Sequence, residues 1–224
     1  GQEQSIRPVH PEGAKLRFHW NTAIAADPHD QNGIYLGSQF LHHSSDHGQT
    51  WSIISPDLTT NDASKQEAYK SGGLTTDATS AENHCTIISI MPHPSRKNEI
   101  WVGTDDGQLQ RTTNGGVLWE NISAGIKQFP KHAWIPQIVI NDNQPDEIWV
   151  VVNNYRQNDW TPYLFHTTDN GKHWENCLDK KNVQGHCLSV CPDLLQTQLI
   201  FLGTDEGLYV SMDDGEKWEK WKYQ

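Results

Sequence analysis

Histidine recurs along the chain at the start of short apolar runs that have the composition of β-strands. The four positions are His19, His84, His132 and His186. Imidazole rings that converge on one point bind Zn, Cu, Ni or Fe, or form hydrogen bonds to a polar ligand. A repeated unit also retains a histidine when the ring only caps backbone groups at a strand end. The histidines therefore predict either a ligand-binding set, with a metal ion among the candidates, or a structural cap.

Pairs of acidic residues follow two other apolar runs. They are Asp105 and Asp106 in TDDG, and Asp205 and Glu206 in TDEG. Retaining and inverting glycoside hydrolases need two carboxyl groups on either side of the glycosidic bond, about 5 to 9.5 Å apart. Asp77 and Glu82 are further candidates for such acids. The alternative is that TDDG and TDEG are hairpin turns, in which Asp beside Gly is favoured for its conformation alone.

A third group of polar and aromatic residues lies in the stretch NNYRQNDW. It contributes Tyr155, Arg156 and Trp160, with amide side chains beside them. Exposed aromatic rings stack on sugar rings, and neighbouring amides fix the sugar hydroxyls by hydrogen bonds. The same aromatic side chains would equally suit packing against a neighbouring part of the fold.

An eight-residue phrase with the pattern [ST]-x-[DN]-x-G-x-x-W occurs four times and organises the chain. The copies are SSDHGQTW, TTNGGVLW, TTDNGKHW and SMDDGEKW. The Asp or Asn turns its side-chain oxygen onto backbone N–H groups ahead of it, the Gly supplies a positive φ, and the Trp enters the core. The residues assigned to these roles are Asp46, Gly48, Trp51, Asn114, Gly116, Trp119, Asp169, Gly171, Trp174, Asp213, Gly215 and Trp218.

Two apolar runs precede each copy of this phrase, and both are rich in β-branched and aromatic residues. One set is IYLGS, IWVGT, IWVVV and IFLGT, and the other is WNTAIA, CTIISI, IPQIVI and CLSV. Such runs predict strands. Each unit therefore predicts four antiparallel strands, which is the description of a β-propeller blade, with no long helix.

The repeats divide the chain into blades. We expect a linker at 1–15, blade 1 at 16–56, an inserted loop at 57–83, blade 2 at 84–124, blade 3 at 125–180 and blade 4 at 181–224. The innermost strands are expected at about 18–26, 84–92, 133–140 and 186–191. A second insertion lengthens the loop between the second and third strands of blade 3.

The repeated phrase resembles the Asp-box, or bacterial neuraminidase repeat, a β-propeller motif of sialidases, xyloglucan-degrading glycosidases and sortilin-type receptors. The whole chain is similar to exported YVTN/BNR-like and sortilin-like propeller proteins, which are often called glycosyl hydrolases on fold alone. This resemblance implies an all-β propeller with its Asp-boxes away from the functional face, and a periplasmic or extracellular location. It implies no activity, because the motif occurs in enzymes and in non-enzymes.

The four predicted blades are more simply an arc of a larger propeller than a closed ring. Every unit supplies its own four strands, and no strand remains to join the first blade to the last. Further blades or a second copy of the chain are the expected neighbours, because repeat arrays need covered ends. An arc would also hold the first and last histidines too far apart for one ion, so a metal ion is expected only in a closed ring and no other cofactor is predicted.

Several classes of protein are disfavoured by composition and motif. The net charge of −11 and the pI near 5.4 argue against nucleic acid and anionic membranes, and no apolar run is long enough to span a bilayer. A sialidase is unlike this chain, since its Arg-Ile-Pro signature and its three carboxylate-binding arginines have no counterpart. The four cysteines lack the spacing of a zinc motif.

The sequence thus favours a non-catalytic propeller platform that binds a polysaccharide or an extended peptide on the face opposite the Asp-boxes. The alternative is a glycoside hydrolase that uses acids on the same face.

Overall fold

The structure is a computed structural model that describes residues 5–67 and 83–222. Asp77 and Glu82, two of the candidate acids, lie outside the described residues. Within the described residues the chain forms four antiparallel sheets of four strands each, and in every sheet the strands lie side by side in chain order. The all-β class and the four-stranded repeat predicted from the sequence are confirmed.

Each sheet is one propeller blade. Blade 1 contains β1 (Ile24–Ala26), β2 (Ile34–Gly37), β3 (Leu41–Ser44) and β4 (Ser52–Ile53). Blade 2 contains β5 (Ile87–Pro92), β6 (Ile100–Thr104), β7 (Leu109–Thr112) and β8 (Glu120–Asn121). Blade 3 contains β9 (Trp134–Asn141), β10 (Gln144–Asn154), β11 (Asp159–Thr167) and β12 (Glu175–Asn176). Blade 4 contains β13 (Cys187–Pro192), β14 (Ile200–Thr204), β15 (Gly207–Ser211) and β16 (Glu219–Lys220).

Helical structure in the described parts of the chain is limited to three short 3₁₀ turns. They are η1 (Ala63–Lys65), η2 (Ser123–Gly125) and η3 (Tyr155–Gln157). None of the helices in these parts has the length and apolar character needed to cross a bilayer.

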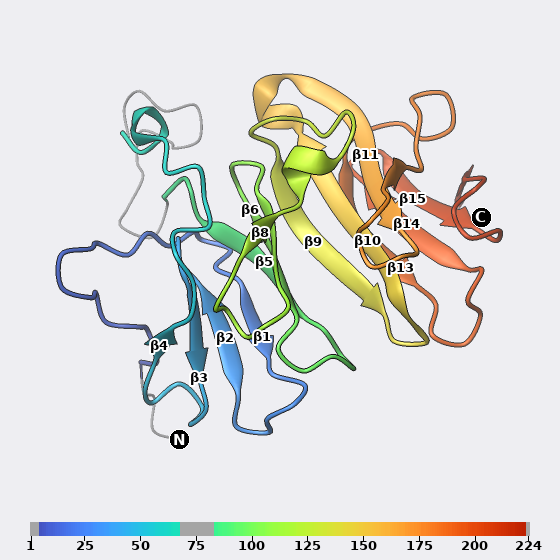
Figure 1. Ribbon diagram of the computed structural model, residues 1–224. Coiled ribbons are helices and arrows are strands. Elements are labelled where there is room, and N and C mark those ends of the chain that lie inside the picture. The colour runs from blue at the N-terminus through green and yellow to red at the C-terminus, as the bar shows by residue number, and fades with distance from the viewer. Residues whose placement is uncertain (1–4, 68–82, 223–224) are drawn as a thin grey trace.

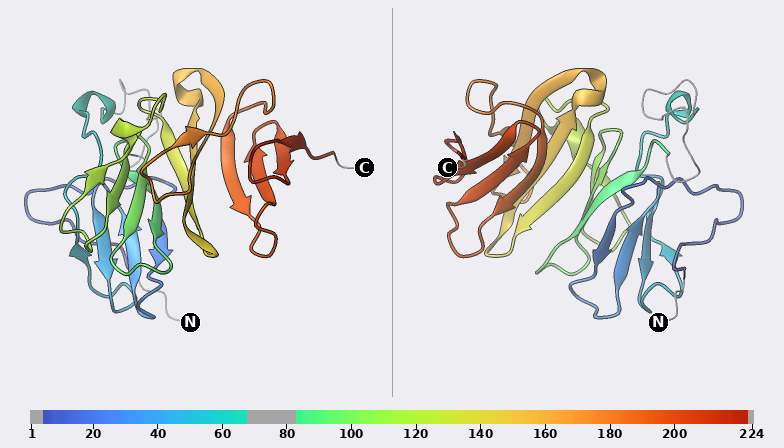
Figure 2. Two further views of the ribbon diagram at one scale, coloured as in Figure 1. Left: turned by 45° about the vertical axis from the view of Figure 1, so that its right-hand side comes forward. Right: turned by 180° about the vertical axis from the view of Figure 1, so that it is seen from behind.

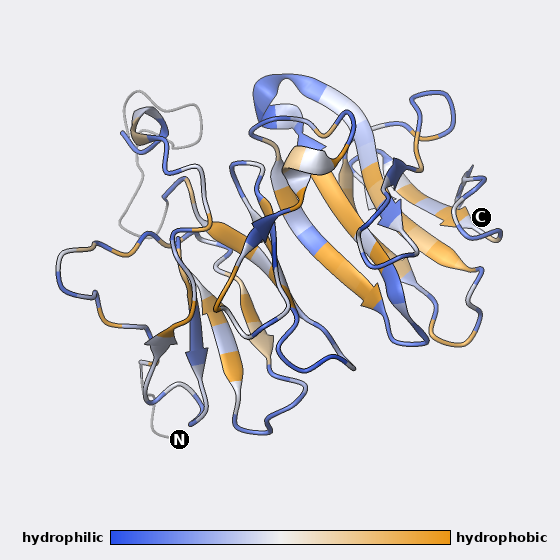
Figure 3. Cartoon of the chain, in the orientation of Figure 1, coloured by the Kyte–Doolittle hydropathy of each residue, from blue (hydrophilic) through white to orange (hydrophobic). Residues whose placement is uncertain are grey.

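The blades follow one another as an arc, with blade 1 and blade 4 at opposite ends of the molecule (Figures 1 and 2). The innermost strands carry the contacts from blade to blade, since β1 lies against β5, β5 against β9 and β9 against β13. Apolar residues concentrate on the inner strands of the blades, whereas most of the connecting loops are hydrophilic (Figure 3).

The core consists of layers between successive blades. The second strand of a blade is covered on both faces, so its sequence is a continuous apolar run and not an alternating one. In β6, Ile100 and Val102 pack toward blade 1, while Trp101 packs toward blade 3. In β10, Val150 packs toward blade 2 and Trp149 toward blade 4.

The four copies of the repeated phrase form the same turn between the third and fourth strands, and we call them the box turns. In each, the hydroxyl of the first residue accepts the glycine N–H: Ser44 from Gly48 at 2.8 Å, Thr112 from Gly116 at 3.0 Å, Thr167 from Gly171 at 3.0 Å and Ser211 from Gly215 at 2.9 Å. The Asp or Asn accepts the N–H four residues ahead: Asp46 from Thr50, Asn114 from Leu118, Asp169 from His173 and Asp213 from Lys217, at 2.8 to 2.9 Å. The predicted side-chain-to-backbone geometry is therefore present in all four turns.

In blades 2, 3 and 4, the tryptophan that ends the box turn anchors its blade to the preceding one. Trp119 donates its Nε1–H to the carbonyl of Ile54 in blade 1 at 3.2 Å. Trp174 meets Trp101 of blade 2 edge-on, with ring centroids 6.1 Å apart. Trp218 packs in one cluster with Trp149 of blade 3. These side chains are buried or half-buried, as predicted, although they lie just before the fourth strand and not within it.

The segment before β1, which spans the described part of the expected linker at 1–15 and the start of the expected blade 1, packs on blade 1. Trp51 donates its Nε1–H to the carbonyl of Ile6 at 2.7 Å, and Leu16 and Phe18 are buried in the same apolar cluster as Trp51. This segment takes the place on blade 1 that a preceding blade takes on the others. β1 begins at Ile24 and not near residue 18, because the His19 ring accepts the N–H of Asn21 at 3.0 Å and the His19 carbonyl accepts the hydroxyl of Thr22 at 2.6 Å, which forms a turn before the strand.

Candidate ligand-binding site

One end of the blades carries the loops that could hold a ligand. Because the strands of a blade are antiparallel, the turn from the second to the third strand lies beside the start of the first strand. Asp105 N donates to the Thr86 carbonyl at 3.0 Å and Asp205 N to the His186 carbonyl at 3.3 Å, which places both turns at this end. We call it the loop end; the box turns lie at the opposite end.

A depression of about 420 Å³ opens at the loop end. It is lined by His19, Trp20, Asn21, Trp134, Pro136, Asn153, Tyr155, Arg156, His186 and Leu188. These residues come from blades 1, 3 and 4. The long strands β10 and β11 carry η3 to the rim, and their connection projects at the top of blade 3 in Figure 1.

Arg156 and Trp134 form one wall of the depression. The guanidinium carbon of Arg156 lies 3.3 Å from the centre of the Trp134 ring and 4.5 Å from that of Tyr155. Such cation–π contacts fix the orientation of both partners. His19 meets the Trp134 ring edge-on, with centroids 4.9 Å apart, so the loop before β1 reaches blade 3.

His186 forms the opposite wall. Its ring lies 4.6 Å from Tyr155 and 5.5 Å from Trp160, measured between centroids. The backbone N–H of His186 donates to Asp205 Oδ1 at 2.8 Å, which anchors the start of β13. The structure thus brings together five residues selected from the sequence: His19, His186, Tyr155, Arg156 and Trp160.

Buried polar atoms without a hydrogen-bond partner among the described residues gather around this depression. They include Trp134 Nε1, Asn153 Oδ1 and His186 Nδ1. His186 Nδ1 lies 3.2 Å from Asp205 Oδ1, but without hydrogen-bond geometry. A buried polar group left unpaired costs about 1 to 3 kcal/mol, so a polar partner for these atoms would stabilise the site.

The acidic residues of blade 2, Asp105 and Asp106, stabilise the fold through hydrogen bonds. Asp105 is fully buried and accepts hydrogen bonds from the N–H and hydroxyl of Thr86, both at 2.8 Å. Asp106 accepts the N–H and hydroxyl of Thr60 at 2.8 and 2.7 Å. Both carboxylates hold the turn and the segment after blade 1 in place, as the hairpin interpretation expects.

The remaining predicted residues lie apart from the depression. His84 is buried with its Nδ1 3.5 Å from Asp105 Oδ2. His132 is exposed and lines a separate hollow together with Asp106. Glu206 is exposed in the turn beside Asp205.

The four histidines are therefore not equivalent, and the expectation that they share one strand position is wrong. Ile87 pairs with Thr104 and Cys187 pairs with Thr204, so His186 is the counterpart of Thr86 and not of His84. Within the described residues, the one cluster of three possible metal ligands contains none of the four. Of the four histidines, His19 and His186 line the same depression, whereas His132 lines a separate hollow.

Trp20 and Trp134 also belong to the site, and neither is among the residues predicted from the sequence. Trp20 directly follows His19, and its side chain is 63% exposed. Trp134 lies two residues after His132 and opens β9. The signal was present in HW and HAW, where a tryptophan follows a histidine shortly before or at the start of an innermost strand.

Comparisons with known proteins identify the fold. The chain matches no protein-family model. It is 22% identical to the xyloglucanase Xgh74A of Acetivibrio thermocellus over 99% of this chain and 27% of that protein. It superposes on an ancestral GH74 enzyme with a TM-score of 0.66 and 17% identity, over 98% of this chain and 25% of that one. For the GH74 xyloglucanase of Xanthomonas campestris the TM-score is 0.65 and the identity 18%, over 89% of this chain and 29% of that one.

The chain is accordingly four blades of a β-propeller like those of GH74 enzymes, and it spans about a quarter of the length of the relatives it matches.

Proposed function

We propose that this arc of blades is a binding platform for a polysaccharide, and that the ligand lies in the loop-end depression. The observation that carries the proposal is the combination of an aromatic wall with unpartnered buried polar atoms. Trp20 and Trp160 have exposed rings, while Trp134 and His186 carry buried ring nitrogens without a hydrogen-bond partner among the described residues. Sugars need both kinds of contact, since each ring has an apolar face and a polar edge.

The names of the relatives support a polysaccharide over a peptide. Xgh74A and the Xanthomonas campestris protein are xyloglucanases. Because the chain matches only about a quarter of such proteins, we infer that it works beside further blades or a second copy of itself. A platform for a polysaccharide of this kind would act outside the cytoplasm, which is the location implied by the sequence resemblance.

Glycoside hydrolysis is the second candidate, and the described acids offer it little. A general acid must reach the glycosidic oxygen. Asp105 and Asp106 are buried and occupied by hydrogen bonds. Asp205 is exposed, but its Oδ1 accepts the N–H of His186. Glu206 is then the exposed acid of this set whose side chain makes no hydrogen bond among the described residues.

Calorimetric titration with soluble oligosaccharides of xyloglucan, xylan and β-glucan tests the platform. We expect one of these to bind the wild-type chain, and Trp20→Ala and Trp160→Ala each to weaken it at least tenfold, about 1.4 kcal/mol. Trp221→Ala is the matched control, because Trp221 is similarly exposed, at 49%, but lies at the end of blade 4.

Release of reducing sugar from the corresponding polymers separates the two candidates. The platform predicts binding without release. Turnover that disappears in Glu206→Gln or Asp205→Asn would instead establish a hydrolase. Binding of extended peptides and of none of the sugars would reject the polysaccharide.

A further inference from the structure

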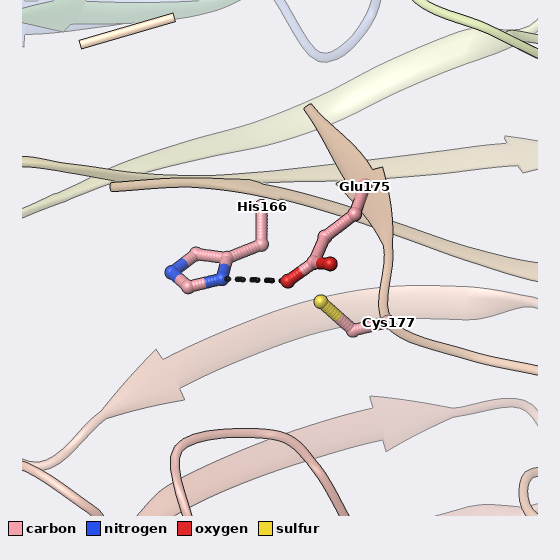
Figure 4. Close-up of side chains that lie close together, drawn as sticks. All are labelled: His166, Glu175 and Cys177. Carbon is pink, nitrogen blue, oxygen red and sulfur yellow. Dashed lines mark ion pairs between the residues drawn. The ribbon is translucent and has the colours of Figure 1, made fainter. Parts of the chain in front are cut away.

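A cluster of three metal-binding side chains lies on the face of blade 3 that is turned toward blade 4. It consists of His166 on β11, Glu175 on β12 and Cys177 just after β12 (Figure 4). His166 and Glu175 are direct partners in the register between the two strands. Cys177 follows Glu175 by two residues, so it points to the same face, as alternate residues of a strand do.

The ligand atoms of this cluster are close enough for one ion. His166 Nδ1 lies 3.9 Å from Glu175 Oε1. One ligand atom from each of His166, Glu175 and Cys177 lies within 4.8 Å of the other two. Tetrahedral zinc holds N, O and S ligands at about 2.0 to 2.3 Å, which separates the ligand atoms by roughly 3.3 to 3.8 Å. The Glu175 side chain is 76% exposed, so it is free to move and to shorten its distances to the other two ligand atoms to these values.

The surroundings of His166 orient its ring toward this point. Its Nε2 lies 3.0 Å from Oε1 of the buried Glu147, and its ring stacks on Trp149 with centroids 3.7 Å apart. A carboxylate on the far nitrogen is the usual support of a metal-binding histidine, because it fixes the tautomer and raises the basicity of the free nitrogen. Here the free nitrogen is Nδ1, on the side of Glu175 and Cys177.

We propose that His166 Nδ1, a Glu175 carboxylate oxygen and Cys177 Sγ bind one Zn²⁺ ion, with a water molecule as fourth ligand. The imidazole and the thiolate suit zinc, and a hard cation such as Mg²⁺ is disfavoured by the sulfur. This site is separate from the loop-end depression, since it adjoins the box turn of blade 3.

The corresponding positions of the other blades show what is special about blade 3. The pair equivalent to His166 and Glu175 is Arg111 and Glu120 in blade 2, Val210 and Glu219 in blade 4, and His43 and Ser52 in blade 1. In blade 2 the permanent cation of Arg111 lies 3.0 Å from the buried Glu99. In blade 3, His166 takes the place of Arg111. Blade 3 also has the Cys177 thiol at the position where blade 2 has Ile122.

A bound cation would also change the state of the thiol. Burial and the nearby carboxylates of Glu175 and Glu147 raise the pKa of Cys177 to about 12, so the thiol is protonated at neutral pH without metal. Coordination removes that proton, as it does for other zinc-bound thiols.

Cobalt substitution tests the site on the whole chain under reducing conditions. A single thiolate bound to Co²⁺ gives a charge-transfer band in the near ultraviolet, to which the other histidines and acids cannot contribute. We expect this band to saturate at one equivalent of Co²⁺ and to disappear when Zn²⁺ is added. Cys177→Ser should abolish it, and Glu175→Gln should weaken Co²⁺ binding at least tenfold.

Cys191→Ser is the matched control, because Cys191 is a free and exposed thiol on β13. This variant should keep the full band. The Cys177 and Glu175 side chains can be changed without opening the buried Glu147 and His166 pair, and a circular dichroism spectrum equal to that of the wild type verifies the fold. Absence of the band from the wild type, or its persistence in Cys177→Ser, would overturn the proposal and leave His166 as the counterpart of Arg111.

Discussion

His42 is a buried histidine whose pKa is strongly lowered. It lies on β3 with 1% of its surface exposed, and its Nε2 is 2.8 Å from the hydroxyl of Ser38. Burial disfavours the charged ring and lowers the pKa of His42 from 6.5 to about 4. The fold therefore depends on a neutral imidazole at this position.

This shift predicts a specific dependence of stability on pH. Between about pH 6.5 and pH 4 the unfolded chain binds a proton on His42 that the folded chain does not bind, so folding stability is complete above pH 6.5 and falls as the pH drops. The shift of about 2.5 pKa units corresponds to roughly 3 kcal/mol. Urea unfolding at pH 7.5 and pH 4.5 should show a loss that is smaller by about 2 to 3 kcal/mol in His42→Gln than in the wild type.

The exposed His47 provides the control for this prediction. His47 has a φ of +59°, which asparagine tolerates, so His47→Asn should keep the pH dependence of the wild type. Equal pH dependence in His42→Gln and the wild type would show that the folded protein protonates His42.

At the level of residues, the sequence predicted which side chains share a loop better than which side chains meet across strands. The proximity of Tyr155, Arg156 and Trp160 could be predicted, because the three residues share one loop. The histidines were aligned by their distance from apolar runs, and the register between strands then separated His84 from His186. The cluster at Cys177 has no motif spacing, because it is assembled across two strands and appears only when their pairing is known.

At the level of elements, the box turn encodes its own conformation. Its hydroxyl, its Asp or Asn and its glycine are joined by hydrogen bonds that span at most four residues. Such local bonding needs no tertiary context, which is why the positions of the four turns could be predicted from eight-residue phrases. The inner strand of blade 1 was predicted too long, because hydrogen bonds of the His19 ring and the Thr22 hydroxyl form a turn just before β1.

The glycine of the box turn provides a prediction about packing between blades. Gly171 has a φ of +82°, and a Cβ built on it would lie 2.7 Å from the Trp101 ring of blade 2. Both the strained backbone and the contact oppose a larger residue, so Gly171→Ala should lower the free energy of unfolding by about 2 kcal/mol or more in urea denaturation. Gly125→Ala is the control, because no atom lies within 4 Å of its added Cβ, and it should change the stability by less than about 0.5 kcal/mol. Equal effects of the two changes would contradict the role of the glycine in blade packing.

At the level of the whole molecule, the two ends of the arc differ. Blade 1 is covered on its outer side by the segment that contains Ile6, Leu16 and Phe18. Phe201 of blade 4 occupies the position of the buried Trp101 in blade 2 and Trp149 in blade 3. Phe201 is only half-buried. Met212 is 74% exposed, and Trp221 lies with it in one hollow.

This asymmetry predicts how the isolated chain associates. Exposed apolar patches of this kind mark interaction surfaces in proteins. Because the outer side of blade 1 is already covered, head-to-tail stacking is disfavoured, and two copies are expected to pair through blade 4 about a twofold axis, which closes the assembly at a dimer. Sedimentation velocity over a range of concentrations should show a monomer and a dimer without larger species. Met212→Lys should shift the equilibrium to the monomer, whereas Leu118→Lys, a change at a similarly exposed residue in the box turn of blade 2, should not. A wild-type chain that remains monomeric at every concentration would show that the exposed face of blade 4 does not drive association. Open-ended polymers would show that a neighbouring copy displaces the segment that covers blade 1.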